Sequence, residues 1–233
     1  MQNYAIQVVI TFAYVVEHLK RIVETLIKNF ILLLQYLMLT LQSLIIIHSV
    51  SGNIYIIASY LQDRLKESGI DARLYRVEDP DLHILAAEND SVNQYLEDIL
   101  DLSVANEETL EKADMIILGA PTRFGGMTAE MKAFLDSTYD MCEERRLVGR
   151  LFGCFTSCAH SICEGSHALD SMLYWAQNMS LLHIPYGVHP EVRLSNQPVA
   201  GIVHLEGRDK GIRPSDKLGD VIDKYVEGIL SYL

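Results

Sequence analysis

The chain has 233 residues, of which 49% are hydrophobic and 21% are charged. This balance excludes a disordered polymer, a collagen-like repeat and a small disulfide-stapled protein, and it predicts one main domain with a buried core. Acidic residues outnumber basic ones by 31 to 19, which gives a net charge of -12. A surface of that sign repels phosphate polyanions, so nucleic acid is disfavoured as a partner.

The four cysteines lie close together in the chain, within Cys142–Cys163. Cysteines so placed do not crosslink distant parts of a fold, and free thiols are typical of a reducing compartment. We therefore predict a cytoplasmic protein.

Residues 1–42 differ from the rest of the chain. Apolar side chains recur at helical spacing between Glu17 and Gln42, with charged side chains on the opposite face. This pattern predicts an amphipathic helical extension, followed by a domain at residues 43–233. The apolar face needs a cover, which is its own domain, another subunit or a membrane surface, so membrane association stays an alternative. Met38 lies six residues before the first predicted strand, which leaves a later start of the protein open.

From Leu44 onward, short apolar runs alternate with helical patterns. The runs predict five strands, at Leu44–His48, Ala72–Val77, Met115–Gly119, Leu151–Thr156 and Leu181–Ile184. The helical patterns predict helices at Ile54–Leu65, Glu107–Ala113, Met127–Thr138, Ser166–Asn178 and Asp216–Leu233. Strands separated by helices predict an α/β fold with a doubly wound, five-stranded parallel sheet covered on both faces. No element is predicted for residues 79–103.

Ligands of such a sheet bind at the carboxyl ends of the strands, so the loops after the first, third and fourth strands are the candidates for a site. The first loop, Ser49–Asn53, combines two hydroxyls, one glycine and a helix amino terminus, which together suit a phosphate group. No Gly-Lys-Ser or Gly-Lys-Thr follows and only one glycine is present, which disfavours ATP and a simple dinucleotide site. The alternative is an ordinary tight turn with an N-cap.

The loop after the third strand carries a more specific string. Gly119–Met127 reads Gly-Ala-Pro-Thr-Arg-Phe-Gly-Gly-Met, and Met131–Asp136 reads Met-Lys-Ala-Phe-Leu-Asp. With a second stretch at Pro198–Ser215, these motifs resemble the flavodoxin-like WrbA-type NAD(P)H:quinone oxidoreductases over about residues 44–233. The alternative is an ordinary strand-to-helix turn capped by Thr128.

The resemblance implies a flavodoxin-like fold, FMN as the cofactor, NADH or NADPH as the co-substrate, a quinone-like acceptor, and a homodimer or homotetramer. It places the FMN phosphate in the first loop, at Ser49, Val50, Ser51, Gly52, Asn53 and Ile54. It places the isoalloxazine ring against two later loops, at Pro121, Thr122, Arg123, Phe124 and Gly125 and at Ser157, Cys158, Ala159 and His160.

The same resemblance implies hydride transfer through the N5 atom of FMN, with reductant and acceptor using the same face in turn. Arg123 and Phe124 are the expected catalytic residues, Arg123 because its charge would stabilise the reduced ring; Ser157 is a weaker candidate for that role. A flavodoxin-like electron carrier and a non-enzymatic binding module of the same fold are the alternatives.

Three positions depart from the family pattern. Cys142 stands where the family has an active-site tryptophan, Gln177 or Asn178 stands near its histidine, and residues 157–165 replace its Gly-Gly-Gln-Glu loop. The cysteines and histidines at Cys154–His167 match no zinc or iron-sulfur spacing, so no metal is expected. His48 is expected to be a hydrogen-bonded structural residue.

Overall fold

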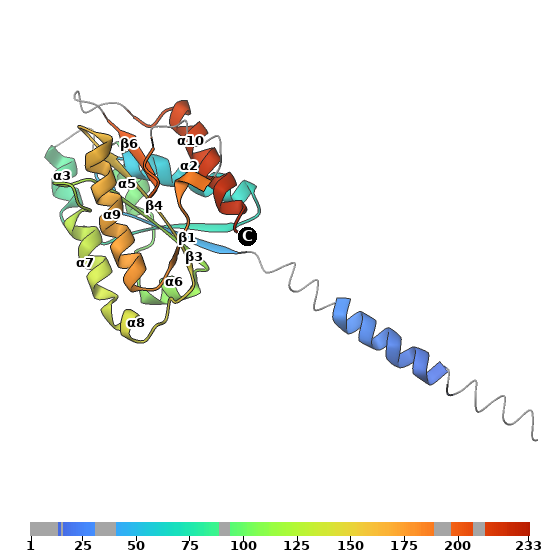
Figure 1. Ribbon diagram of the computed structural model, residues 1–233. Helices are drawn as coiled ribbons and strands as arrows, with labels where there is room; N and C mark the ends of the chain where they lie inside the picture. The colour runs from blue at the N-terminus through green and yellow to red at the C-terminus, as the bar shows by residue number, and fades with distance from the viewer. Residues whose placement is uncertain (1–13, 15, 31–40, 89–93, 189–196, 207–212) are drawn as a thin grey trace, which may run out of the picture. The chain divides into compact units, whose positions relative to one another are not determined.

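The computed structural model describes residues 14, 16–30, 41–88, 94–188, 197–206 and 213–233 (Figure 1). The chain divides into two compact units, Met1–Thr40 and Leu41–Leu233. In the first unit, residues 16–30 form a helix whose apolar side chains are exposed. Within the described ranges, no helix is both long enough and apolar enough to cross a membrane. The parts of the predicted extension at 1–13, 15 and 31–40 lie outside the described residues. Gln42, predicted to end the helical pattern, instead begins a strand.

The second unit is built on a parallel sheet with the order β2-β1-β3-β4-β5, and β6 also pairs with β4. The strands are β1 (Gln42–Ile47), β2 (Asp71–Arg76), β3 (Met115–Pro121), β4 (Leu151–Cys158), β5 (Leu182–His183) and β6 (Ile202–Leu205). This order is the flavodoxin-like one, with the switch point between β1 and β3. The predicted doubly wound parallel sheet is confirmed.

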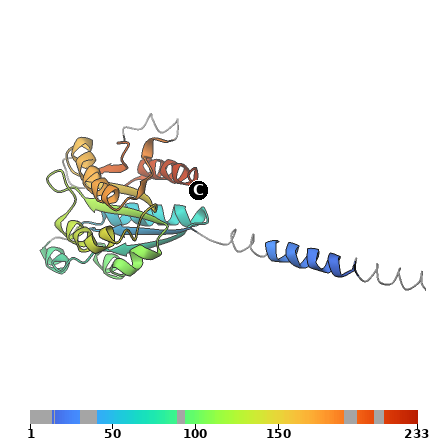
Figure 2. The same cartoon turned by 60° about the horizontal axis from the view of Figure 1, so that its bottom comes forward.

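Helices cover both faces of the sheet. One face carries α2 (Asn53–Glu67) and α10 (Asp216–Leu230), which lie side by side in both views (Figures 1 and 2). The other carries α6 (Glu107–Lys112), α7 (Ala129–Ser137), α8 (Tyr139–Glu143) and α9 (Ile162–Asn178). Residues 79–103, for which no element was predicted, include the short helices α3 (Leu82–Glu88) and α5 (Leu96–Leu100).

The fifth position of the sheet differs from the prediction. Only Leu182 and His183 of the predicted strand at Leu181–Ile184 are in β5, and they pair with the first two residues of β4. Further along the same edge, Phe155–Cys158 of β4 pair with β6, a strand that was not predicted. The described sheet therefore has six strands in five positions, because one edge position is shared by two short segments separated by a long connection.

The register of the strands brings their carboxyl ends together. Ile47 of β1 lies beside Gly119 of β3, Pro121 lies beside Ser157 of β4, and Cys158 lies beside Leu205 of β6. All but the last residue of β3 and the first of β4 are buried, since helices cover both faces. Four neighbouring strands of the sheet, β1, β3, β4 and β6, thus end at one edge, each followed by a loop.

Candidate functional site at the carboxyl edge of the sheet

The loop between β1 and α2 forms a cradle for an anion. The Ser49 hydroxyl, almost fully buried, accepts a hydrogen bond at 3.2 Å from the amide of Tyr55 in the first turn of α2. In the described part of the chain, the amides of Asn53 and Ile54 donate to no backbone carbonyl, as expected at a helix start. These amides and the positive end of the helix favour a negatively charged group.

Gly52 is required at the end of that loop. Its φ is +93°, in the left-handed region, and a Cβ added to it would lie 2.2 Å from Cδ2 of Tyr95. Tyr95 comes from the stretch between α3 and α5, and its ring is 6.1 Å from the ring of Tyr55. The glycine of the sequence motif is therefore explained by backbone conformation and by an aromatic side chain packed directly on it.

The loop after β3 is fixed to β4 at its base. The amide of Thr122 donates to the carbonyl of Ser157 at 2.8 Å, and the Thr122 hydroxyl is 2.9 Å from that of Thr156. The Thr156 hydroxyl donates in turn to the carbonyl of Ala120 at 2.7 Å. Pro121 is half-buried at the start of this loop. The hydroxyl chain holds the backbone of the motif rigidly against its neighbouring strand.

The tip of the same loop is a two-residue turn. Arg123 and Gly126 exchange two backbone hydrogen bonds of 2.9 Å, and Phe124 and Gly125 between them have φ values of +49° and +79°. Phe124 is fully exposed. A left-handed conformation is unfavourable for a phenylalanine, so the turn holds an aromatic ring in solvent at a cost of about 1 kcal/mol.

The alternative for this loop, an ordinary turn capped by Thr128, is only half met. Thr128 occupies the N-cap position of α7, but its hydroxyl makes no capping hydrogen bond and is buried without a partner in the described part of the chain.

The residues after β4 divide into two groups. Ser157 and Cys158 belong to the strand itself and are buried, whereas Ala159 is half-buried and His160 is exposed. His160 lies 3.5 Å from the Glu164 carboxylate, close to the start of α9. Burial raises the pKa of the Cys158 thiol to about 11, so this cysteine is not a reactive thiolate at neutral pH.

Two side chains that the sequence analysis did not single out reach the first loop from the segment between β6 and α10. The carboxylate of Glu206 accepts hydrogen bonds from the Asn53 amide and, at 3.4 Å, from the Ser157 hydroxyl. The guanidinium of Arg213 donates to the carbonyl of Ser51 and, at 2.9 Å, to the side-chain oxygen of Asn53. Both residues lie within the Pro198–Ser215 stretch that carried the resemblance, and that resemblance is the sequence feature that could have pointed to them.

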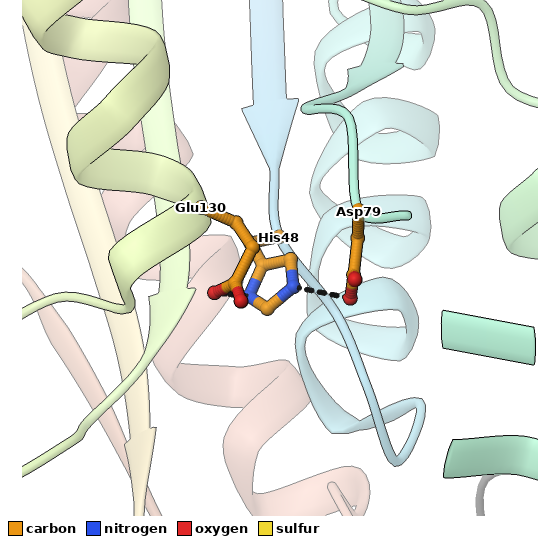
Figure 3. Close-up of side chains that lie close together, drawn as sticks. All are labelled: His48, Asp79 and Glu130. Carbon is orange, nitrogen blue, oxygen red and sulfur yellow. Dashed lines mark hydrogen bonds and ion pairs between the residues drawn. The ribbon is translucent and has the colours of Figure 1, made fainter. Parts of the chain in front are cut away.

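His48 links three elements beside the site (Figure 3). Its Nε2 lies 2.9 Å from the Asp79 carboxylate and its Nδ1 lies 3.7 Å from the carboxylate of Glu130 on α7. The predicted hydrogen bond of His48 is present. Among the described residues, these three have ligand atoms close enough together to be considered as a cation site, all within 4.8 Å of one another. However, the carboxylates face opposite ring nitrogens, which leaves an ion one nitrogen and one carboxylate, too few for a strong site.

Comparison with known proteins shows the family of this chain. The family model for NADPH-dependent FMN reductases matches residues 43–190, which is more than half of the chain. This chain belongs to that family. It is 36% identical over 114 residues to an NAD(P)H dehydrogenase (quinone) of Archaeoglobus fulgidus, covering 49% of this chain and 60% of that protein. A protein of the same name from Aromatoleum aromaticum is 33% identical over 147 residues, covering 61% and 70%.

The solved structures agree on the fold of this FMN reductase family member. A flavodoxin, WrbA-like protein from Agrobacterium tumefaciens superposes with a TM-score of 0.52 at 17% identity, covering 81% of this chain and 93% of that one. At such identity the likeness establishes the flavodoxin-like fold alone.

Three observations fit the family's flavin to these loops. Gly52 holds a backbone turn that a Cβ would obstruct, the two amides at the start of α2 have no backbone acceptor in the described chain, and a carboxylate already lies on the Asn53 and Ser157 donors. The donor set therefore suits the phosphate of FMN. It consists of hydroxyls and amides, as the sequence predicts for this loop.

Two of the three departures from the family pattern, at Cys142 and Asn178, lie in the helical layer, whereas the third, residues 157–165, begins at the end of β4 at the sheet edge. The Cys142 thiol on α8 donates to the carbonyl of Asn178 at the end of α9, at 3.2 Å. Both residues line a cavity of about 340 Å³ between α7, α8 and α9, together with Trp175. None of the sequence-predicted site residues lines this cavity. The cavity lies mainly in the helical layer, and Met127, at the end of the loop after β3, also lines it.

Proposed function

We propose that the chain is an FMN-dependent NAD(P)H:quinone oxidoreductase. The observation that carries the proposal is the placement of two motifs, the Ser49–Ile54 cradle and the Pro121–Gly125 loop, after strands β1 and β3. These strands flank the switch point of a doubly wound sheet, which is where such folds bind their ligands. Membership of the FMN reductase family supports the cofactor, and the names of the quinone-reducing relatives support the acceptor.

Each loop would do a different part of the work. Bound FMN supplies two-electron chemistry at its ring. The amides at the start of α2, with Ser49 and Ser51, would hold the phosphate. The backbone of the Pro121–Gly125 loop would position the ring, because the hydroxyl chain through Thr122 and Thr156 keeps that loop in one conformation. Ser157, Cys158, Ala159 and His160 would approach the ring from the next loop.

Arg123 and Phe124 would act on the reacting groups. The Arg123 side chain is exposed, has no carboxylate partner among the described residues, and hydrogen-bonds only to the carbonyl of Thr122 at 3.2 Å. Its charge is therefore available to stabilise negative charge on a reduced ring. The exposed ring of Phe124 is available to pack against a flat co-substrate or acceptor.

We further propose a homodimer or homotetramer in the cytoplasm. Four free cysteines support a reducing compartment, and the exposed Phe124 supports a site that a second copy helps to cover. Mass measurement by light scattering tests the assembly, and a monomer would contradict it.

The proposal is tested on the purified full chain. The visible spectrum should show bound flavin, and chromatography of the heat-released flavin should identify FMN. Oxidation of NADH and of NADPH should then depend on added benzoquinone. Flavin without NAD(P)H turnover would indicate an electron carrier instead, and a protein that binds no flavin would indicate a non-enzymatic module.

Arg123→Gln probes the proposed charge. It should lower kcat/KM about tenfold while leaving FMN affinity unchanged, because the side chain would act on the reduced ring and not on the phosphate. Lys132→Gln, on the exposed face of α7, is the charge-matched control. Equal losses in the two variants would remove Arg123 from the mechanism.

A further inference from the structure

The segment between β6 and α10 places one acidic and one basic side chain on the cradle after β1. Glu206 directly follows β6, whose pairing with β4 carries the chain to the sheet edge, and its amide donates to the carbonyl of Cys158 at 2.8 Å. Arg213 lies just before the N-cap of α10, Ser215. Each residue therefore lies within two positions of a strand end or a helix cap, which fixes its backbone near the cradle.

Asn53 connects the two charges. Its side-chain amide donates to the Glu206 carboxylate, while its side-chain oxygen accepts from the Arg213 guanidinium at 2.9 Å. Asn53 is itself buried, as the first residue of α2. The side-chain amide of Asn53 is held in one orientation, because turning it round would break the hydrogen bonds to both partners.

Arg213 is fixed over the loop by four contacts. Besides Ser51 and Asn53, its guanidinium donates to the side-chain oxygen of Gln94 at 3.3 Å and lies 5.2 Å from the centre of the Tyr95 ring. Tyr95 packs on Gly52. No carboxylate forms an ion pair with Arg213 among the described residues, so its charge is balanced only through Asn53 and neutral oxygens.

We propose that Arg213 and Glu206 set two properties of this chain: its preference for FMN over riboflavin, and the rate at which it releases FMN. Arg213 pairs with the phosphate, and Glu206 competes with the phosphate for the donors on Asn53 and Ser157. This inference rests on the proposed function, since it assigns the charge selection at the same flavin site. It adds a cation to a loop whose own residues carry none.

The charges make the direction of each effect definite. A flavin phosphate carries nearly two negative charges, so a guanidinium beside it favours FMN over riboflavin, which has no phosphate. The Glu206 carboxylate disfavours FMN, both by like-charge repulsion and because its own hydrogen bonds must be given up. FMN binding is consequently weaker, and release faster, than the cradle and Arg213 would allow by themselves.

The test measures the dissociation constants of FMN and riboflavin by quenching of flavin fluorescence on the full chain from which flavin has been removed. Arg213→Gln should weaken FMN binding at least tenfold and change riboflavin binding less than twofold. Glu206→Gln should tighten FMN binding about fivefold, slow FMN release, and leave riboflavin within twofold. Lys217→Gln and Asp220→Asn, exposed positions on α10, are the charge-matched controls.

Two further measurements keep the test decisive if one variant folds poorly. Arg213→Lys retains the charge and should retain most of the preference for FMN over riboflavin. Raising the salt concentration should reduce that preference in the wild-type chain and much less in Arg213→Gln, because screening weakens only the charge pairing.

The outcomes separate the two proposals. A wild-type chain that binds neither flavin contradicts the proposed function, and with it this inference. A chain that binds FMN, but in which Arg213→Gln weakens FMN and riboflavin equally, contradicts the inference alone. Weaker FMN binding in Glu206→Gln would also overturn it, because the carboxylate would then be a ligand of the flavin and not a competitor.

Discussion

The two ends of the proposed flavin site are built in opposite ways. The phosphate end is buried: Asn53 and Ser49 are nearly inaccessible, and Tyr95 covers Gly52. The ring end is a turn in solvent, where Phe124 is fully exposed with an unfavourable backbone conformation. Changes at the buried end should therefore affect folding and binding together, whereas changes at the exposed end should affect turnover without weakening the fold.

The largest effect on stability is expected at His48. This residue follows β1 and contacts both Asp79 and Glu130 of α7, the helix after the Pro121–Gly125 loop. His48→Leu leaves the buried Asp79 carboxylate without its side-chain partner, so the free energy of unfolding should fall by about 3 kcal/mol. Urea unfolding of the wild type and the variant measures this change in free energy. The double variant His48→Leu, Asp79→Leu should recover most of the loss, and a single variant within 1 kcal/mol of wild type would show that the pair does not matter.

Gly52→Ala tests whether the buried end couples folding to binding. The left-handed backbone and the contact with Tyr95 should lower the free energy of unfolding by about 2 kcal/mol and weaken FMN binding more than tenfold. Gly69→Ala is the matched control, since its φ is +85° and nothing lies near its Cβ position. The coupling is refuted if Gly52→Ala loses stability but binds FMN as the wild type does.

Phe124→Gly tests the exposed end. Glycine accepts the φ of +49° without strain, so the free energy of unfolding should stay constant or rise by up to about 1 kcal/mol. The same change should lower kcat/KM for benzoquinone about tenfold, because the exposed ring is lost. Phe124→Ala should lose the same activity without the gain in stability. Full activity in both variants would remove Phe124 from the proposed mechanism.

The smallest effect is expected at Cys158, where the site meets the sheet. Burial raises its pKa from 9.0 to about 11, so the thiol stays protonated at pH 7.5 and iodoacetamide should label the exposed Cys163 instead. The proton is held more tightly in the folded state, so this thiol's contribution to stability is present below about pH 9 and is lost as the pH rises towards 11. Mass spectrometry of labelled peptides reads out the selectivity; rapid labelling of Cys158 at pH 7.5 would contradict it.

The elements with strong local patterns were predictable, and those that depend on pairing were not. β1 and β3 were evident as apolar runs because both faces of a parallel strand are buried. β6 has only four residues, and its place is decided by the free edge of β4 beyond β5. The helices α3 and α5 have only seven and five residues, too few for periodicity to identify them.

The sequence by itself determined the fold class and pointed to two loops of the proposed flavin site, because strand burial, turn-forming residues and a helix start are local properties that leave local patterns. Only the tertiary structure decided that Tyr95 covers Gly52 and that Glu206 and Arg213 meet at Asn53. These contacts join positions more than forty residues apart in sequence. Their geometry depends on how β6 shares an edge with β5 and on where α10 begins, and no spacing along the chain encodes either.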